Sequence, residues 1–304
     1  MELQDVLNRI QAELADAGGV GAVADYIPEL ATVAPDSFGM AVVTVGGGVS
    51  RFGDAERLFS IQSISKVFAL AMALQSEGDA LWQRVGREPS GHAFNSLVQL
   101  ENEAGIPRNP FINAGALVVT DVLCSRFAVP ENAVVDFLRS ITGRDDLLYN
   151  RRVARSERET GHRNAALAHF MKSFGNLMNP VDQVLDAYCR QCAIEMSCVD
   201  LARAAAVLAG RGVSPATGAR LLGSEVVRQL NAVMQTCGTY DGAGDFAVRV
   251  GLPAKSGVGG GILAVVPGQC GLCVWSPRVD ASGNSVLGVR ALERFVALSG
   301  HSVF

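Results

Sequence analysis

The sequence predicts an α+β protein in three layers (helix, sheet, helix) with an inserted lobe that is entirely helical. Two observations support this prediction. Strand-like segments lie near both ends of the chain, at residues 39–52 and 261–275, whereas the pattern between them is almost wholly helical from residue 63 to about residue 235. Because the strands enclose the helical middle, we expect both chain ends to contribute to one antiparallel sheet that is flanked by helices.

The length and composition of the chain are sufficient for one large core or two smaller ones. The chain has 304 residues, of which 49% are hydrophobic, and chains of this size fold as one or two domains. We place an α/β sheet domain at residues 1–62 plus 223–304 and a mainly helical lobe at residues 63–222.

The N-terminal elements follow from the spacing of apolar residues. Residues 3–16 carry them at helical intervals, which predicts an amphipathic helix. Residues 39–45 and 49–52 read as strands, and the glycine run 46–48 between them predicts a hairpin. A buried helix is expected to open at Ser63 and to end near residue 78.

The later elements follow from caps and turns. Asn179-Pro180 is typical of a helix start, and Ser197 to Asp200 predicts a capping box for a helix that runs to residue 210. Another helix begins at Ser224. After Tyr240 the pattern returns to strands, with a turn at Pro267-Gly268, and a last helix is expected at residues 288–298.

The charge and hydropathy of the chain exclude two classes of partner. The net charge is −4 and the pI is about 5.6, so no basic field attracts nucleic acid or an anionic membrane. No apolar run reaches membrane-spanning length, and the acidic, amphipathic start of the chain lacks the basic and apolar regions of a secretory signal. We expect a cytoplasmic protein that binds neither nucleic acid nor membrane.

The cysteines raise the question of a metal site. Seven cysteines without an export signal indicate free thiols rather than a disulfide framework. Cys189/Cys192 and Cys270/Cys273 have the spacing of zinc ligands, so a zinc-stabilised interaction module is one alternative. Structural zinc usually takes its cysteines from short glycine-rich loops, whereas these pairs fall at a helix end and in an apolar strand-like run. We therefore expect core cysteines, with no metal and no cofactor.

Ser63 and Lys66 are the first candidates for chemistry. Residues three apart share one face of a helix, so these two side chains can touch. A serine hydroxyl becomes a good nucleophile when a neighbour takes its proton, and a lysine that is desolvated among apolar residues can do so. A helix N-terminus also offers free N–H groups that suit an oxyanion. An N-cap serine followed by a solvated lysine is the alternative interpretation of the same pattern.

A second motif strengthens the serine–lysine pair. Lys255-Ser256-Gly257 precedes the strand that begins at Gly261, and its glycines let the backbone approach a ligand closely. Ser-x-x-Lys followed far downstream by Lys-[Ser/Thr]-Gly is the order in penicillin-recognising serine enzymes. The Ser-Asp-Asn motif that lies between them in those enzymes is absent here.

Several segments, in order and over nearly the whole chain, together resemble the serine-dependent glutaminases, which adopt the serine β-lactamase-like fold. The matching segments are Asp25–Pro28, Gln62–Phe68, Asn109–Ala116, Ser156–Glu157 with Thr160–Asn164, Tyr188 with Gln191–Cys192, Thr236–Gly242 and Lys255–Gly261. The departures noticed, such as Thr239 and three of the cysteines, fall on no position assigned to chemistry.

The resemblance implies a catalytic set of Ser63, Lys66 and Tyr240. Ser63 would attack the side-chain amide of L-glutamine, giving a γ-glutamyl-enzyme and ammonia, and water would then release glutamate. The backbone N–H groups of Ser63 and Val258 would hold the oxyanion. Either Lys66 or Tyr240 would remove the serine proton, and the sequence leaves this choice open.

The resemblance also implies the residues that bind the amino acid head group. Glu157 and Asn164 would lie near it, and a carboxylate is in any case the natural partner of an ammonium. Asn113, Tyr26 and Tyr188 would hold the carboxylate or close the pocket by hydrogen bonds. Taken singly, each of these residues also fits an ordinary use as a solvated charge, a cap, a turn residue or a core side chain.

Three other functions compete with the glutaminase reading. A penicillin-recognising peptidase or β-lactamase would be acylated by a penicillin, but it needs an export route. A non-catalytic glutamine sensor would bind glutamine without releasing ammonia, although binding alone requires neither Ser63 nor Lys66. The zinc-stabilised module would contain stoichiometric metal. The family resemblance further leads us to expect a homodimer or homotetramer.

Overall fold

A five-stranded antiparallel sheet forms the centre of the structure, a computed structural model that describes residues 2–91 and 95–304. Its strands run in the order β3-β2-β8-β7-β6. Their bounds are β2 Gly39–Thr44, β3 Val49–Gly53, β6 Ala254–Ser256, β7 Gly261–Val266 and β8 Cys270–Trp275. β2 pairs with β8, so the two chain ends meet in the middle of the sheet. This confirms the predicted fold class.

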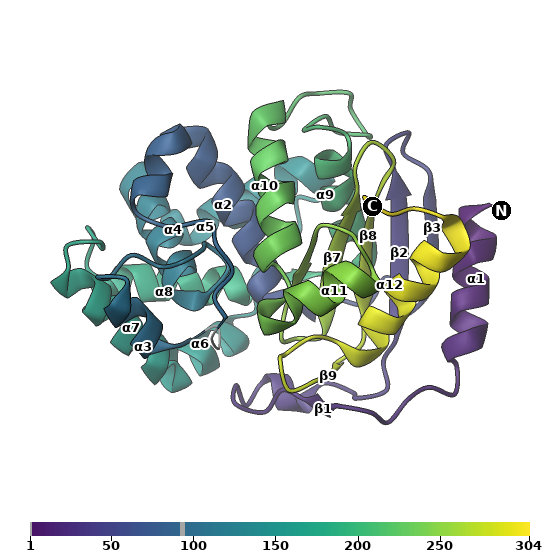
Figure 1. Cartoon of the computed structure of the whole chain (residues 1–304), viewed down its shortest axis with the longest axis horizontal. Helices are drawn as coiled ribbons and strands as arrows, with labels where there is room; N and C mark the ends of the chain where they lie inside the picture. The colour runs from purple at the N-terminus through teal and green to yellow at the C-terminus, as the bar shows by residue number, and fades with distance from the viewer. Residues whose placement is uncertain (1, 92–94) are drawn as a thin grey trace.

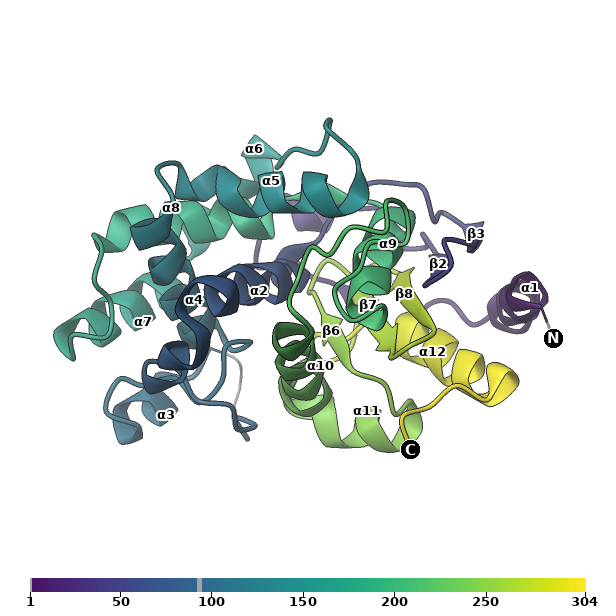
Figure 2. The ribbon, with the colours of Figure 1, turned by 90° about the horizontal axis from the view of Figure 1, so that it is seen from above.

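Helices cover both faces of the sheet (Figures 1 and 2). α1 (Leu3–Leu14) and α12 (Val286–Ser299) pack on one face, and α9 (Cys198–Ala209) packs on the other. Side chains alternate between faces along a strand. Met40 and Val42 therefore pack in the core with α1 and α12, whereas Ala41 and Val43 pack in the core with α9. This arrangement gives the three predicted layers.

The helical lobe lies beside the sheet (Figure 1), and its apolar side chains belong to the same hydrophobic core as those of α9. Its helices are α2 Ser65–Glu77, α3 Leu97–Asn102, α4 Asn113–Arg126, α5 Pro130–Thr142, α6 Arg151–Thr160, α7 His162–Ser173 and α8 Val181–Cys192. α2 is apolar on nearly all sides, and its residues from 65 to 74 are buried. α10 (Ser224–Cys237) packs against α2, so it joins the lobe to the sheet domain.

Short elements connect the lobe and the sheet. β1 (Ala22–Val23) pairs with β9 (Arg278–Val279), and β4 (Phe59–Ser60) pairs with β5 (Glu195–Met196). The remaining elements are the helix α11 (Ala243–Arg249) and the 3₁₀ turns Leu30–Thr32, Gln62–Ile64, Gly78–Gln83 and Tyr240–Gly242. The β4–β5 pair holds the chain just before Ser63 against the lobe.

Most sequence-predicted elements are confirmed, and two differ. The capping box of Ser197 and Asp200 is present. Ser63 does not open α2 but lies in a 3₁₀ turn before it, because Gln62 adopts a left-handed φ of +48°. The prediction of strands directly after Tyr240 is wrong, since α11 comes first. The two-domain division stays a prediction, and α9, placed in the lobe, packs on β2 and β8.

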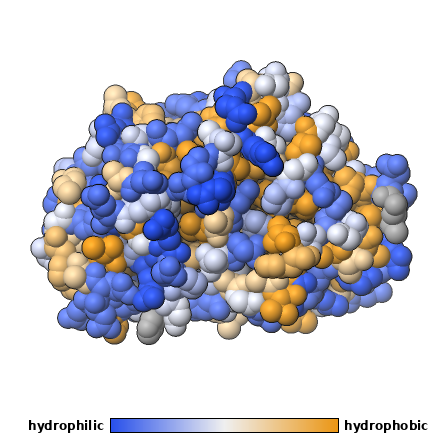
Figure 3. Space-filling model, turned by 45° about the horizontal axis from the view of Figure 1, so that its top comes forward, coloured by the Kyte–Doolittle hydropathy of each residue, from blue (hydrophilic) through white to orange (hydrophobic). Residues whose placement is uncertain are grey.

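The surface carries both hydrophilic and hydrophobic residues. On the face in Figure 3 they are interspersed. Within the described ranges, 2–91 and 95–304, every helix is too short or too polar to cross a lipid bilayer.

Candidate active site

Ser63 lies where the β6–β7 turn packs against the chain between β4 and α2. A Cβ on Gly257 would be 2.6 Å from the carbonyl oxygen of Ile61, and a Cβ on Gly259 would be 2.6 Å from that of Ser60. Only glycine permits both approaches, so these two residues bring Val258 beside Ser63. Among the described residues, no hydrogen-bond acceptor faces the N–H of Ser63 or of Val258. Two free donors therefore lie beside the hydroxyl.

The amine of Lys66 lies in the interior, one turn along the chain from Ser63. Its side chain is buried, and Nζ donates to the carbonyl oxygen of Phe111 (3.2 Å) and to Oδ1 of Asn113 (2.7 Å). Burial lowers the pKa of Lys66 to about 8, although the nearby Cys192 and Glu157 act to raise it. A buried lysine with this pKa is partly neutral near pH 7, as the desolvation argument from sequence predicts.

The hydroxyl of Ser63 neighbours Tyr240 and acts to lower the Tyr240 pKa. Tyr240 donates to the carbonyl oxygen of Ser256 at 3.1 Å, and it holds a left-handed φ of +56°. Burial raises the pKa of Tyr240 above its usual value, and the neighbouring Ser63 opposes this. No hydrogen bond joins the Ser63 hydroxyl to the Lys66 amine in the described chain. Tyr240 therefore neighbours the serine, whereas the Lys66 amine is bonded to Phe111 and Asn113.

A second lysine lies behind Tyr240. Lys255 is fully buried, and its Nζ donates to the carbonyl oxygens of Gly238 (3.0 Å) and Ser256 (2.6 Å). Nζ is 4.3 Å from the centroid of the Tyr240 ring. Burial and the positive charge of Lys66 hold the pKa of Lys255 well below its usual value. The region around Ser63 therefore holds two amines that burial drives toward the neutral form.

A cavity opens in front of Ser63. Its lining includes these residues predicted from the sequence: Tyr26, Ser63, Asn113, Glu157, Asn164, Tyr188 and Val258. Asn113 connects the cavity to Lys66, because its Oδ1 accepts from the lysine while its Nδ2 donates to Oδ1 of Asn164 at 2.9 Å. The hydroxyl of Tyr188 donates to the same Asn113 Oδ1 at 3.3 Å. One side of the cavity is thus a connected polar network.

Glu157 places a buried carboxyl group in this cavity. It lies on α6 and is 6% exposed. Burial raises its pKa to about 7, whereas the neighbouring Cys192 and Gln62 side chains and the charge of Lys66 act to lower it. Its Oε2 atom is buried without a hydrogen-bond partner. A buried oxygen that lacks a partner is costly unless a ligand supplies the donor, so this atom marks the position of a cation or N–H group.

The comparisons with known proteins agree with this geometry. The glutaminase family model matches residues 21–304. The glutaminase of Ralstonia nicotianae is 62% identical over 304 residues, covering 100% of both chains. The chain belongs to the glutaminase family. A solved structure titled as the probable glutaminase ybaS has a TM-score of 0.94 at 37% identity, covering 99% of this chain and 98% of that one.

One solved relative has a ligand in its title. The structure titled as Mglu in its glutamate form has a TM-score of 0.93 at 40% identity, covering 99% of this chain and 69% of that one. Family membership makes this chain an amidohydrolase, and the serine β-lactamase-like fold is that of its structural neighbours. Among the sequence alternatives, the penicillin-recognising enzymes are therefore set aside.

Three residues around the site carry contacts that sequence reasoning did not assign. Gln62 and Cys192 both act to lower the pKa of Glu157, and Lys255 lies over Tyr240. Each falls inside a segment that matches the glutaminase family, and this was the signal that could have found them. These residues come from the 3₁₀ turn before α2, from α8 and from β6, so local spacing does not specify their neighbours.

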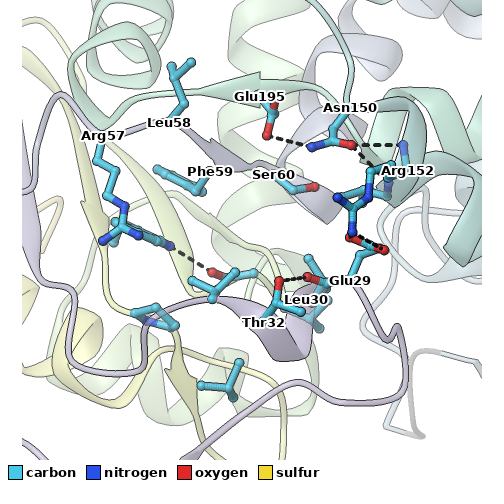
Figure 4. Close-up of a pocket in the computed structure, with 17 residues that line it drawn as sticks. Glu29, Leu30, Thr32, Arg57, Leu58, Phe59, Ser60, Asn150, Arg152 and Glu195 are labelled. Atoms are coloured by element: carbon cyan, nitrogen blue, oxygen red, sulfur yellow. Dashed lines mark hydrogen bonds and ion pairs between the residues drawn. The ribbon is translucent and has the colours of Figure 1, made fainter.

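A larger cavity, of about 350 Å³, lies on the other side of Val258 and Gly259 (Figure 4). Its polar side chains pair with one another: Glu195 accepts from Asn150, and Arg152 pairs with Glu29. Neither Ser63 nor Glu157 lines it. The smaller cavity, which Ser63 and Glu157 both line, is therefore the candidate site.

The cysteines are free thiols in the interior, with the first Cys-x-x-Cys pair on α8 and the second on β8. Burial raises the pKa of the Cys189 and Cys192 thiols above the usual range, which keeps both protonated. Over residues 2–91 and 95–304, His, Cys, Asp and Glu side chains form no cluster that could hold a metal ion.

Proposed function

We propose that the chain hydrolyses the side-chain amide of L-glutamine to L-glutamate and ammonia through an acyl-enzyme on Ser63. One observation carries this proposal. The Ser63 hydroxyl and two free N–H groups, those of Ser63 and Val258, border the same cavity as the unpartnered Oε2 of Glu157. A nucleophile with oxyanion donors and a separate anion for an ammonium are what an amino acid amide requires.

The proposed reaction has two steps. The oxygen of Ser63 bonds to the side-chain carbonyl carbon of glutamine, and the N–H groups of Ser63 and Val258 stabilise the oxyanion that forms. The C–N bond then breaks, and the nitrogen leaves as ammonia after receiving the serine proton. In the second step water attacks the γ-glutamyl ester, glutamate leaves, and the proton returns to Ser63.

We assign the base to Lys66, with Tyr240 as its relay. A pKa of about 8 leaves roughly one Lys66 amine in ten neutral at pH 7. The pKa of Tyr240 lies above the usual tyrosine value, so its phenolate is far scarcer. The hydroxyl of Tyr240 neighbours Ser63 and would transfer a proton without remaining ionised.

The remaining cavity residues are proposed to select the head group. Glu157 would take the α-ammonium, because it is the buried carboxyl group with a free oxygen. Asn113, Asn164, Tyr188 and Tyr26 would bind the α-carboxylate through amide and hydroxyl hydrogen bonds or close the cavity over the substrate. The relative titled in its glutamate form supports a site of this kind for the reaction product.

The test compares Ser63→Ala with Ser76→Ala, a control serine on α2, the helix that follows the 3₁₀ turn with Ser63; the Ser76 hydroxyl donates to the carbonyl oxygen of Ala73. We expect Ser63→Ala to keep its fold and to lose ammonia release from glutamine, while Ser76→Ala keeps full turnover. Mass spectrometry of quenched wild-type enzyme should show a glutamyl adduct on the peptide with Ser63. If Ser63→Ala retained normal turnover, the acyl-enzyme would be wrong. Tight glutamine binding by the wild type without any ammonia would identify a sensor.

The assembly of the protein is part of the proposal. We infer a homodimer or homotetramer from the family resemblance. Light scattering coupled to gel filtration measures the mass directly, and a monomer at working concentration would contradict the inference.

A further inference from the structure

We propose that Trp275 is a positioning residue for the oxyanion site: its indole N–H group holds the β6–β7 turn so that the backbone N–H of Val258 faces the reacting carbonyl. This inference rests on the proposed function, because it takes the Val258 N–H as an oxyanion donor. It assigns a role in the chemistry to a buried side chain of β8 that lines the larger cavity.

Val258 lies at a corner of the β6–β7 turn. Gly257 to Gly260 form a four-residue turn, which closes because the Gly260 N–H donates to the carbonyl oxygen of Gly257 at 2.9 Å. Val258 and Gly259 are the two central residues of this turn. The same closing bond occurs in turns with different central dihedral angles, so it does not by itself fix the orientation of the Val258 N–H.

Trp275 supplies a hydrogen bond to the centre of the turn. Its indole Nε1–H donates to the carbonyl oxygen of Gly259 at 2.9 Å. Across residues 2–91 and 95–304, no other hydrogen bond reaches Val258 or Gly259. Trp275 is the last residue of β8, and it pairs with Gly261 on β7. The donor is thus anchored in the central sheet, whereas its acceptor lies in the turn.

Packing fixes the plane of the indole. The ring of Phe59 stacks on it, with ring centroids 4.9 Å apart and an interplanar angle of 2°. The guanidinium carbon of Arg57 lies 5.6 Å from the centroid of the Trp275 ring, and Nη1 of Arg57 donates to the Ser37 hydroxyl at 2.8 Å. Arg57 and Phe59 line the larger cavity together with Trp275 (Figure 4). An indole packed in this way keeps its N–H group directed at Gly259.

The larger cavity explains why a single bond matters here. The close approach of Gly259 to the carbonyl oxygen of Ser60 limits movement of the turn toward the Ser63 segment. Val258 and Gly259 also line the cavity of about 350 Å³, so packed atoms do not oppose movement into that space. The Trp275 bond restrains this movement. Without it the Val258 N–H would occupy the oxyanion position for less of the time and would stabilise the oxyanion less.

The experiment compares Trp275→Phe with Trp82→Phe, because phenylalanine keeps an aromatic ring and removes the N–H donor. Trp82, the other tryptophan of the chain, is the matched control. Its Nε1 donates to Oε1 of Gln229 at 2.9 Å, and the guanidinium carbon of Arg87 lies 5.5 Å from its ring centroid, but it lines neither cavity.

The expected effect is on kcat. We expect Trp275→Phe to lower kcat for glutamine about tenfold, a part of the roughly 10²–10³-fold that loss of a whole oxyanion donor costs. The KM should change little, because the proposed head-group residues do not lie on the turn. Trp82→Phe should keep the kcat of the wild type, although it loses a hydrogen bond of the same length.

A double variant separates positioning of the turn from a merely structural role. A Cβ at Gly257 would displace the same turn from the Ile61 carbonyl oxygen, so Gly257→Ala and Trp275→Phe should act on one donor. We expect the double variant to lose less than about threefold in kcat beyond Gly257→Ala alone, since coupled sites are not additive. A structural effect of Trp275 elsewhere would instead multiply with that of Gly257→Ala.

Three outcomes overturn the inference: a folded Trp275→Phe enzyme with kcat within about twofold of the wild type, an equal loss in Trp82→Phe, or a loss that multiplies fully in the double variant. If Trp275→Phe does not fold, 3-benzothienylalanine at residue 275 keeps the shape of tryptophan with sulfur in place of the N–H, and the same loss in kcat is expected. Failure of the proposed function is distinguishable, because the wild type would then release no ammonia or Ser63→Ala would remain active.

Discussion

Gly257→Ala tests whether the β6–β7 turn supplies an oxyanion donor. Gly257 has an ordinary φ, so alanine there causes no backbone strain of its own. Its Cβ would lie 2.6 Å from the carbonyl oxygen of Ile61, whereas ordinary contact begins at 3.4 Å. The turn must therefore move away from the Ser63 segment by about 0.8 Å, the difference between these distances.

This displacement is large for a hydrogen bond. An oxyanion contact near 2.9 Å would lengthen to about 3.7 Å, beyond the range in which an N–H group bonds well. Loss of one such donor costs about 2.7–4 kcal/mol, or roughly 10²–10³ in kcat. The KM for glutamine should change little, because the proposed head-group residues Glu157 and Asn164 lie on helices that the β6–β7 turn does not move.

Steady-state ammonia release gives kcat and KM, and circular dichroism with a thermal melt checks the fold. Gly244→Ala is the control, since its Cβ would meet nothing within 4 Å and its φ is ordinary. Alanine in that short helix should stabilise the protein by about 0.5–1 kcal/mol and leave kcat unchanged. A folded Gly257→Ala enzyme with kcat within twofold of the wild type would refute the oxyanion role of Val258.

Further predictions concern charge. Lys66→Arg should lose at least about 10²-fold in kcat, because an arginine does not deprotonate, and wild-type kcat/KM should rise with pH toward the Lys66 pKa of about 8. An ammonium bound to Glu157 should lower the Lys66 pKa, so the pKa in the pH profile of kcat should lie below the pKa in the profile of kcat/KM. Paired pH profiles test this, and equal values would contradict a link between Glu157 and Lys66. Asp121→Ala should destabilise the fold by about 3–5 kcal/mol in urea denaturation, because it leaves the Arg84 partner without its buried carboxylate. Although burial raises the Asp121 pKa, hydrogen bonds lower it overall, so its stabilising effect should fade as the pH falls through that lowered pKa.

Local signals were sufficient for most of the fold and insufficient for the internal contacts of the site. The capping box at Ser197 is confirmed because it depends on residues within one turn. The left-handed Gln62 before Ser63 could not be predicted, because the approach of Gly257 and Gly259 determines the path of that segment. The family-like segments contain the predicted residues that line one cavity, but the position of Lys255 over Tyr240 depends on how distant elements pack.

The proposed ammonium site at Glu157 further predicts that the substrate activates its own base, Lys66. Glu157 acts to raise the Lys66 pKa while burial lowers it to about 8. An ammonium bound at Oε2, as proposed, would neutralise the Glu157 charge that stabilises the lysine cation, so we expect the Lys66 pKa to fall when glutamine occupies the cavity. Each unit of that fall makes the neutral amine up to tenfold more abundant at pH 7. A ligand without an α-amine lacks this effect, and it therefore loses turnover as well as affinity. We therefore expect the proposed head-group site and the base to be coupled through the Glu157 carboxyl group.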